Sequence, residues 1–164
     1  MKKILTVALL IMAVLAITTS AMAATGLGAV TSVSLTPATA EKAGSVSVNT
    51  TMCAVTLDEA GKIVAVKFDV VQPKAAFDAA GAASGELNAA PQTKKELKEG
   101  YGMKRVSSIG KEWYEQAAAF CAFITGKTLN EAIAIAANPA ETDVIASCTI
   151  STSDYLQLIV KAGL

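Results

Sequence analysis

The sequence predicts an α+β domain in which an antiparallel sheet, built on a β-hairpin, is covered on one face by helices and ends in a strand-helix unit. Three observations predict this fold. Residues 45–57 and 63–71 are rich in Val, Ile and Thr and flank a turn-forming DEAGK run. Two Thr-x-x-Glu capping patterns open helical stretches after residue 92. Residues 144–150 alternate apolar and small side chains before a Ser-led helix.

The hairpin is the first predicted element. Apolar side chains at alternate positions from Val64 to Val70 share one face of its second strand, whereas Lys67 and Asp69 lie on the other. This alternation is typical of a sheet with one dry and one wet face. The dry face therefore requires a layer of helices.

Helices are expected after a loop over residues 75–91, where Gly and Ala leave no clear period. Thr93 with Glu96 predicts a short helix that ends at Gly100. Longer helices are expected from about residue 111 to Gly126, from Thr128 to Asn138, and from Ser151 onward. The large side chains expected to anchor the core are Phe68, Phe77, Trp113, Phe120, Phe123 and Tyr155.

The first 23 residues have the composition of a secretory signal peptide. Lys2 and Lys3 precede an uncharged run from Ile4 to Ile17, and Ala21-Met22-Ala23 is a small-residue cleavage site. The run is too short for a membrane span, so cleavage after Ala23 predicts a soluble chain that is secreted or held at the cell surface, with no transmembrane segment. Residues 24–44 are expected to be a flexible arm or an edge strand, and residues 45–164 a single domain.

Charge and composition exclude several classes of function. The sequence has 14 Lys and Arg against 14 Asp and Glu, and loss of Lys2 and Lys3 with the leader leaves a net charge of about −2. A general affinity for nucleic acid is therefore not expected. The chain contains no His, so the common zinc sites and His-assisted nucleophiles are not expected, and the chain is more typical of a binding module than of an enzyme.

Three widely spaced cysteines, an odd number, leave two interpretations open. Cys53, Cys121 and Cys148 are either buried thiols that act as small apolar side chains, or Cys53 and Cys148 form a disulfide.

The segment from Thr93 to Gln116 is the most specialised part of the sequence. It combines six basic residues with glycines and with Tyr101, Lys104 and Trp113, a mixture that suits an anionic, planar ligand such as a flavin. The alternative is that Lys and Glu decorate solvated helix faces and Trp113 belongs to the core.

Residues 93–117, TKKELKEGYGMKRVSSIGKEWYEQA, together with residues 58–72, DEAGKIVAVKFDVVQ, resemble a family of small exported proteins of Gram-positive anaerobes. The overall plan is distantly similar to the exported FMN-binding domains of membrane electron-transfer systems. In those domains an S-G-A-T-x-T-S motif carries FMN esterified through its phosphate to a threonine-type hydroxyl.

The nearest segment here is A-S-C-T-I-S-T, residues 146–152. The resemblance places Thr149 and Ser151 on the hydroxyl positions and Thr152 on the final Ser, whereas Ala146 and Ser147 replace the Ser and Gly of the motif. It implies FMN as a cofactor, held between these hydroxyls and the segment with Tyr101, Lys104 and Trp113. A strand followed by a capped helix explains the same residues without a ligand.

Two functions from different classes follow. One is a secreted, non-catalytic ligand-binding or electron-transfer module that holds a flavin or another anionic aromatic molecule. The other is a cell-surface structural or interaction protein that binds no small ligand and self-associates by strand pairing through residues 24–44.

Overall fold

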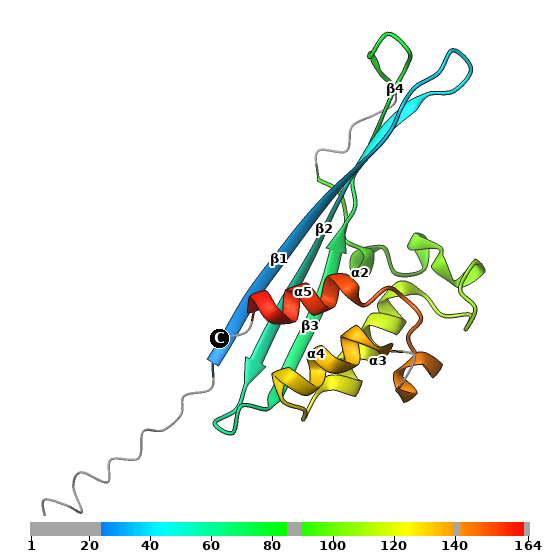
Figure 1. The fold of residues 1–164 in the computed structure, drawn as a ribbon. Helices are drawn as coiled ribbons and strands as arrows, with labels where there is room; N and C mark the ends of the chain where they lie inside the picture. The colour runs from blue at the N-terminus through cyan, green and yellow to red at the C-terminus, as the bar shows by residue number, and fades with distance from the viewer. Residues whose placement is uncertain (1–23, 85–89, 140–141, 163–164) are drawn as a thin grey trace, which may run out of the picture.

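A computed structural model describes residues 24–84, 90–139 and 142–162 (Figure 1). The predicted leader, residues 1–23, lies outside the described residues. Five strands form one antiparallel sheet: β1 (Ala24–Thr36), β2 (Gly44–Leu57), β3 (Ile63–Val71), β4 (Lys74–Phe77) and β5 (Ala83–Ser84). The helices are α2 (Lys94–Leu97), α3 (Trp113–Ile124), α4 (Leu129–Ala137) and α5 (Ser153–Ala162), with the short 3₁₀ helices η1 (Lys98–Tyr101), η2 (Met103–Arg105) and η4 (Asp143–Ala146).

Strand β2 is the centre of the sheet. Along one edge it pairs with β1 over the full length of β1, and along the other edge it pairs first with β4 and then with β3. The predicted hairpin of residues 45–57 and 63–71 is thus β2 and β3. Residues 24–36, for which the sequence allowed an arm or an edge strand, form β1, whose other edge has no strand partner in the described part of the chain.

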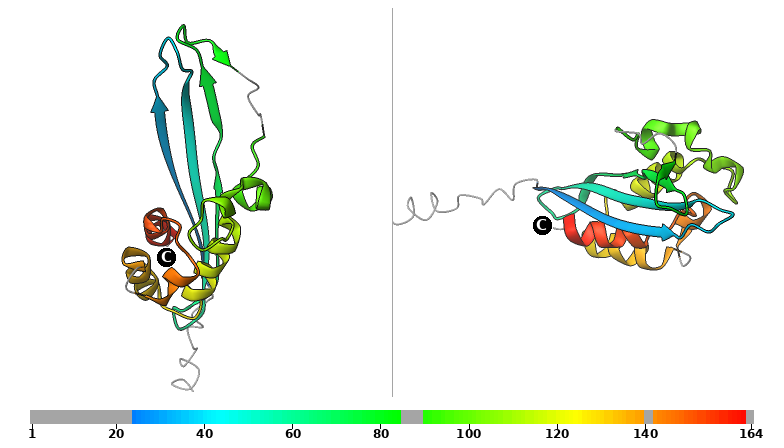
Figure 2. Two further views of the ribbon diagram at one scale, coloured as in Figure 1. Left: turned by 90° about the vertical axis from the view of Figure 1, so that its right-hand side faces the viewer. Right: turned by 90° about the horizontal axis from the view of Figure 1, so that it is seen from above.

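Helices α3, α4 and α5 cover one face of the sheet and leave the other face bare (Figure 2). Helix α5 lies over β1 and β2, α3 packs against β3, and α4 packs against α5. The β1–β2 hairpin continues well beyond this helical layer as a projecting ribbon (Figures 1 and 2). The predicted fold class, an antiparallel sheet covered on one face by helices, is confirmed.

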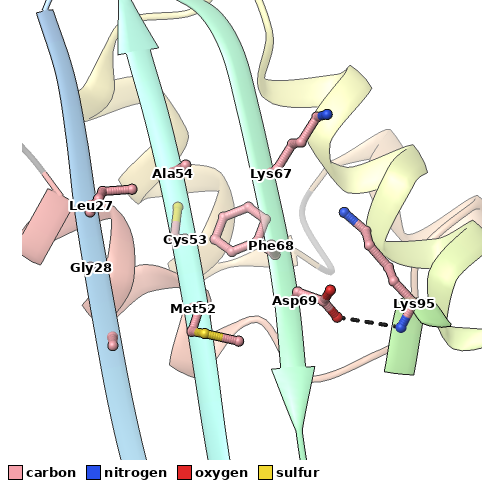
Figure 3. A pocket seen from close by; sticks show the side chains of 10 residues that line it. Leu27, Gly28, Met52, Cys53, Ala54, Lys67, Phe68, Asp69 and Lys95 are labelled. Atoms are coloured by element: carbon pink, nitrogen blue, oxygen red, sulfur yellow. Dashed lines mark hydrogen bonds between the residues drawn. The ribbon is translucent and has the colours of Figure 1, made fainter. Parts of the chain in front are cut away.

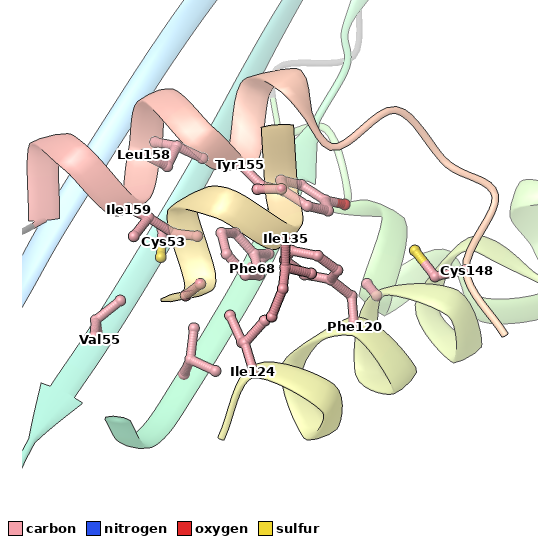
Figure 4. Packing of buried hydrophobic residues seen from close by; sticks show 14 of the residues in the cluster. Cys53, Val55, Phe68, Phe120, Ile124, Ile135, Cys148, Tyr155, Leu158 and Ile159 are labelled. Atoms are coloured by element: carbon pink, nitrogen blue, oxygen red, sulfur yellow. The ribbon is translucent and has the colours of Figure 1, made fainter. Parts of the chain in front are cut away.

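The core lies between the sheet and the helices (Figure 4). The Phe68 ring from β3 stacks on Tyr155 of α5 with 4.2 Å between centroids and meets Phe120 of α3 at 5.7 Å. These three side chains and Trp113 are buried, as predicted. Phe77 and Phe123 are only partly buried, because β4 lies on the projecting ribbon and Phe123 is on the flank of α3.

Helix α5 approaches β1 so closely that only glycine fits there. A Cβ atom added to Gly26 would overlap the Ala162 carbonyl oxygen, and one added to Gly28 would lie 2.9 Å from the Leu158 carbonyl oxygen. The two glycines therefore allow the last turns of α5 to rest directly on the strand backbone.

The DEAGK turn and a second turn that the sequence analysis missed have the same structure. Asp58 accepts hydrogen bonds through Oδ1 from the amides of Ala60 and Lys62, both at 2.9 Å. In the DAAGA run, Asp78 Oδ1 accepts hydrogen bonds in the same way from the amides of Ala80 and Ala82. Gly61 and Gly81 both have positive φ. The loop predicted over 75–91 therefore includes the last three residues of β4, this turn and β5, with residues 85–89 outside the described range.

Three local predictions were wrong. The strand over 144–150 is instead η4 and an irregular segment, in which Val144 and Cys148 are buried without a strand partner. Val64 is half exposed, because the register between β2 and β3 shifts at Leu57 and places Ile63 in the core instead. The short helix after Thr93 continues as η1 and ends at Gly102, which has a φ of 75°.

Candidate functional site

A hollow of about 650 Å³ lies on the bare face of the sheet (Figure 3). We call it the open-face hollow; its lining is Leu27, Gly28, Ala29, Met52, Cys53, Ala54, Lys67, Phe68, Asp69 and Lys95. Most of this lining is apolar, and it comes from three adjacent strands and from α2. Its volume falls within the usual range of small-molecule sites.

The pleat of the sheet explains which side chains reach this hollow. Along β2, Cys53 and Val55 point into the core, so Met52 and Ala54 between them point to the bare face. On β3 the same alternation puts Lys67 and Asp69 on the bare face, which the sequence predicted. Leu27 adds an apolar wall from β1 and is 77% exposed.

Helix α2 contributes Lys95, which is the second amine of the hollow beside Lys67 of β3. Its N-terminus is fixed by the predicted capping box, in which Thr93 and Glu96 exchange side-chain and backbone hydrogen bonds. The Lys95 amide also donates to Asp69 Oδ1 at 3.3 Å, and this hydrogen bond holds the start of α2 beside β3 (Figure 3). The lining thus carries two amines and one carboxylate, and that carboxylate is already engaged by backbone amides.

The predicted ligand residues of the 93–116 segment lie elsewhere. Tyr101 and Trp113 are brought together by Lys94, whose Nζ lies 4.8 Å from the Tyr101 ring centroid and 5.6 Å from that of Trp113. Trp113 is buried, whereas Lys104 is exposed on η2. A cation of the chain itself therefore occupies the position over these rings where a ligand was expected to stack.

Gln116, which the sequence analysis missed, connects the two predicted halves of the site. Its Nε2 donates to Ser107 Oγ at 3.0 Å and to the Lys111 carbonyl at 3.1 Å. Its Oε1 accepts from both the amide and the hydroxyl of Thr149, at 2.8 and 3.1 Å. The Gln116 side chain is fully buried and all its hydrogen-bonding positions are used, so its role is structural.

A second hollow, of about 300 Å³, lies beside the predicted hydroxyl residues. Thr149, Ser151 and Thr152 all line it, together with Ala136, Ala137, Pro139, Ile145, Cys148 and Ile150. Thr149 is bonded to Gln116, and the buried Thr152 hydroxyl donates to the Ala136 carbonyl at 2.7 Å. The lining contains no basic side chain, so these residues do not fit a flavin held through its phosphate.

All three cysteines are free thiols, and the alternative Cys53–Cys148 disulfide is not formed. Figure 4 shows Cys53 on β2 and Cys148 on the segment before α5, at opposite sides of the core cluster. Burial raises the pKa of the Cys53 thiol to about 12, and burial also raises the pKa values of Cys121 and Cys148. These thiols are poor nucleophiles at neutral pH.

The described residues, 24–84, 90–139 and 142–162, hold no group of three or more Cys, Asp or Glu side chains placed to bind a metal ion. They also include no helix that is long and apolar enough to cross a membrane.

The chain is similar over part of its length to a known protein. It is 37% identical, over an alignment of 97 residues that covers 52% of this chain, to a protein of Desulfitobacterium hafniense named chlorophenol reductase. That stretch is 29% of the relative, so this chain corresponds to less than a third of it. No family model matches the chain. No solved structure matches it either.

Proposed function

We propose that this chain is an exported, redox-related binding module that holds a planar aromatic anion, of the flavin or phenolate class, non-covalently in the open-face hollow. The observation that carries this proposal is the combination of an apolar floor with two amines, Lys67 and Lys95, at one side of the hollow. An aromatic ring gains free energy by burying its face on Leu27, Met52 and Ala54. A phosphate or phenolate oxygen gains a charge-assisted contact with an amine.

The partial similarity to chlorophenol reductase supports a redox-related role. The name of that protein gives a chlorophenol, an aromatic compound, as what it reduces, and the ligand class inferred from the hollow is also aromatic. Export is supported by the composition of residues 1–23. FMN remains the specific flavin to test, now in the open-face hollow rather than beside Ser151.

Ligand binding can be measured directly with the mature protein. Titration with FMN, with riboflavin and with a chlorophenol, followed by flavin fluorescence and by native mass spectrometry, should detect a one-to-one complex. FMN should bind more tightly than riboflavin, because only FMN carries the phosphate. Ala54→Trp should abolish binding by filling the hollow, and Lys95→Ala should weaken FMN binding about tenfold while changing riboflavin binding little.

Matched variants separate this site from the one that the sequence predicted. Lys104→Ala and Ser151→Ala change exposed residues outside the open-face hollow and should leave FMN affinity unchanged. The opposite pattern, in which Lys104→Ala releases FMN and Ala54→Trp does not, would place the ligand in the predicted segment. Failure of the wild-type protein to bind any of the three ligands would overturn the proposal.

A second function is favoured by a different feature, the open edge of β1. A structural or interaction protein that self-associates through residues 24–44 would use this edge and would need no ligand. Deletion of the arm would be a poor test, because β1 is part of the sheet and its loss would expose the core. Substitutions of exposed side chains on β1 test this function without that damage.

A further inference from the structure

Within the described part of the chain, the outer edge of strand β1 has no strand partner. Over Ala24–Thr36 it contains no charged residue and no proline, and it pairs with β2 at every position without a bulge. Soluble proteins usually guard a long edge strand with such features, since free backbone groups attract other strands. A thirteen-residue edge that lacks all three is suited to strand pairing.

The direction of the backbone N–H and C=O groups shows which residues of β1 can form hydrogen bonds with another strand at the open edge. The Val48 amide of β2 donates to the Pro73 carbonyl, away from β1. In an antiparallel pair the residue opposite, Val33, must then point its own N–H and C=O away from β2. Ala29 does the same, because its carbonyl oxygen accepts a hydrogen bond from Lys161 Nζ at 3.1 Å. Odd-numbered residues of β1 therefore present their backbone groups to the open edge.

We propose that this edge pairs with β1 of a second copy of the chain, antiparallel and centred on Val30, to form a two-fold symmetric dimer with a continuous sheet. In this register Ala29 of each copy exchanges backbone hydrogen bonds with Thr31 of the other. Leu27 faces Val33 across the junction, twice by symmetry. These two side chains are 77% and 66% exposed in the single chain, and both lie on the bare face. Pairing would give each an apolar neighbour.

The shape of the molecule suits this register. Helix α5 covers β1 at Gly26 and Gly28, whereas residues 31–36 of β1 are all exposed. The β1–β2 hairpin continues past the helices as the projecting ribbon (Figures 1 and 2). Antiparallel pairing about Val30 sets the projecting half of each copy beside the helix-covered half of the other. The helical layers of the two copies are thereby offset along the junction instead of meeting.

The side chain of Lys161 reaches this edge from α5. In the dimer the Thr31 amide of the second copy replaces Lys161 Nζ as the donor to the Ala29 carbonyl, and the exposed lysine returns to water. The dimer does not depend on a ligand in the open-face hollow. It deepens the self-association function by naming its partner and its register.

Sedimentation velocity of the mature protein tests the inference. The wild-type protein should be a dimer at concentrations of about 10–100 µM. Val33→Glu should weaken the dimer at least about tenfold, because it sets a carboxylate against Leu27 twice over. Val106→Glu is the matched control, since Val106 is 85% exposed and lies outside the strands, and it should leave the dimer intact.

The register is tested by a double substitution. Leu27→Lys combined with Val33→Glu sets opposite charges face to face at both symmetric positions, so dimerisation should recover relative to Val33→Glu alone. Circular dichroism should show native folding for every variant, because both positions are exposed. A monomeric wild-type protein, a dimer unaffected by Val33→Glu, or a double variant that stays monomeric would overturn the inference. Ligand titration of the monomeric variant separates this result from the ligand proposal.

Discussion

At the scale of single residues, the close contact of Gly26 with α5 predicts a large loss of stability when Gly26 is replaced. Gly26→Ala would put a methyl group in severe steric overlap with the Ala162 carbonyl, so α5 must shift or the strand must bend. We expect the free energy of unfolding to fall by about 3 kcal/mol, measured by urea denaturation.

Gly100→Ala is the control for this change. A Cβ at Gly100 meets no atom within 4 Å, and its φ is not positive. Its stability should therefore stay within about 0.5 kcal/mol of the wild type. Equal losses of unfolding free energy in the two variants would mean that the close packing of α5 on β1 does not require glycine at position 26.

Residue-scale features were predictable where the signal is local. Alternation along β3 placed Lys67 and Asp69 on the bare face, and the DEAG segment, residues 58–61, predicted the turn between β2 and β3. The DAAG segment, residues 78–81, has the same pattern of Asp and Gly, but no turn was predicted there. The exposure of Val64 depends on a bulge between two strands, which has no signature within the strand itself.

At the scale of elements, the hydrogen bonds of Gln116 make α3 the anchor for two loops. Gln116→Met keeps the shape of the side chain but removes its bonds to Ser107, Lys111 and Thr149. Because the Thr149 amide then loses its acceptor, we expect a loss of about 2–3 kcal/mol in unfolding free energy. Hydrogen exchange of the Thr149 amide should also accelerate.

Tyr114→Phe is the matched control on the same helix. The Tyr114 hydroxyl donates to Glu99 at 2.9 Å in a hydrogen bond that is exposed to solvent, so the variant should have wild-type stability and wild-type exchange at Thr149. A Gln116→Met protein that behaves like Tyr114→Phe would contradict the anchoring role.

Helices whose first residue is fixed by a local capping motif were predicted well. Both Thr-x-x-Glu boxes cap helices, because the hydrogen bonds they require lie within four residues. The predicted strand over 144–150 was wrong, because the alternating apolar residues there have no neighbouring strand to supply a ladder. Val144, Cys148 and Ile150 are buried, but Ala146 is exposed. Strand formation is decided by a partner that is distant in the sequence.

At the scale of the whole molecule, the fold class was predictable but the open-face hollow was not. The hollow joins Leu27, Met52 and Lys95, which are brought together only by strand register and by the docking of α2. The sequence instead favoured a segment dense in basic and aromatic residues. In the structure Lys94 packs against those aromatic rings, so composition alone did not identify the hollow.

The buried thiols link the stability of the whole molecule to alkaline pH. Burial raises the pKa of Cys53 from 9.0 to about 12, so the folded state keeps this proton where the unfolded state loses it. The contribution of Cys53 to stability is thus intact below about pH 9 and declines as the pH rises toward 12. The pKa values of Cys121 and Cys148 are also raised, so these thiols act in the same direction.

Cys53→Ala isolates this effect from other groups that titrate at high pH. The alanine variant should be less stable than the wild type at pH 7, because it leaves a cavity beneath α5. Its deficit should shrink above about pH 9, since only the wild type has a thiol there that ionises on unfolding. Urea denaturation of both proteins between about pH 7 and pH 10.5 measures the difference. Parallel stability curves would show that the Cys53 thiol ionises equally well in the folded state, and would contradict its burial in the core.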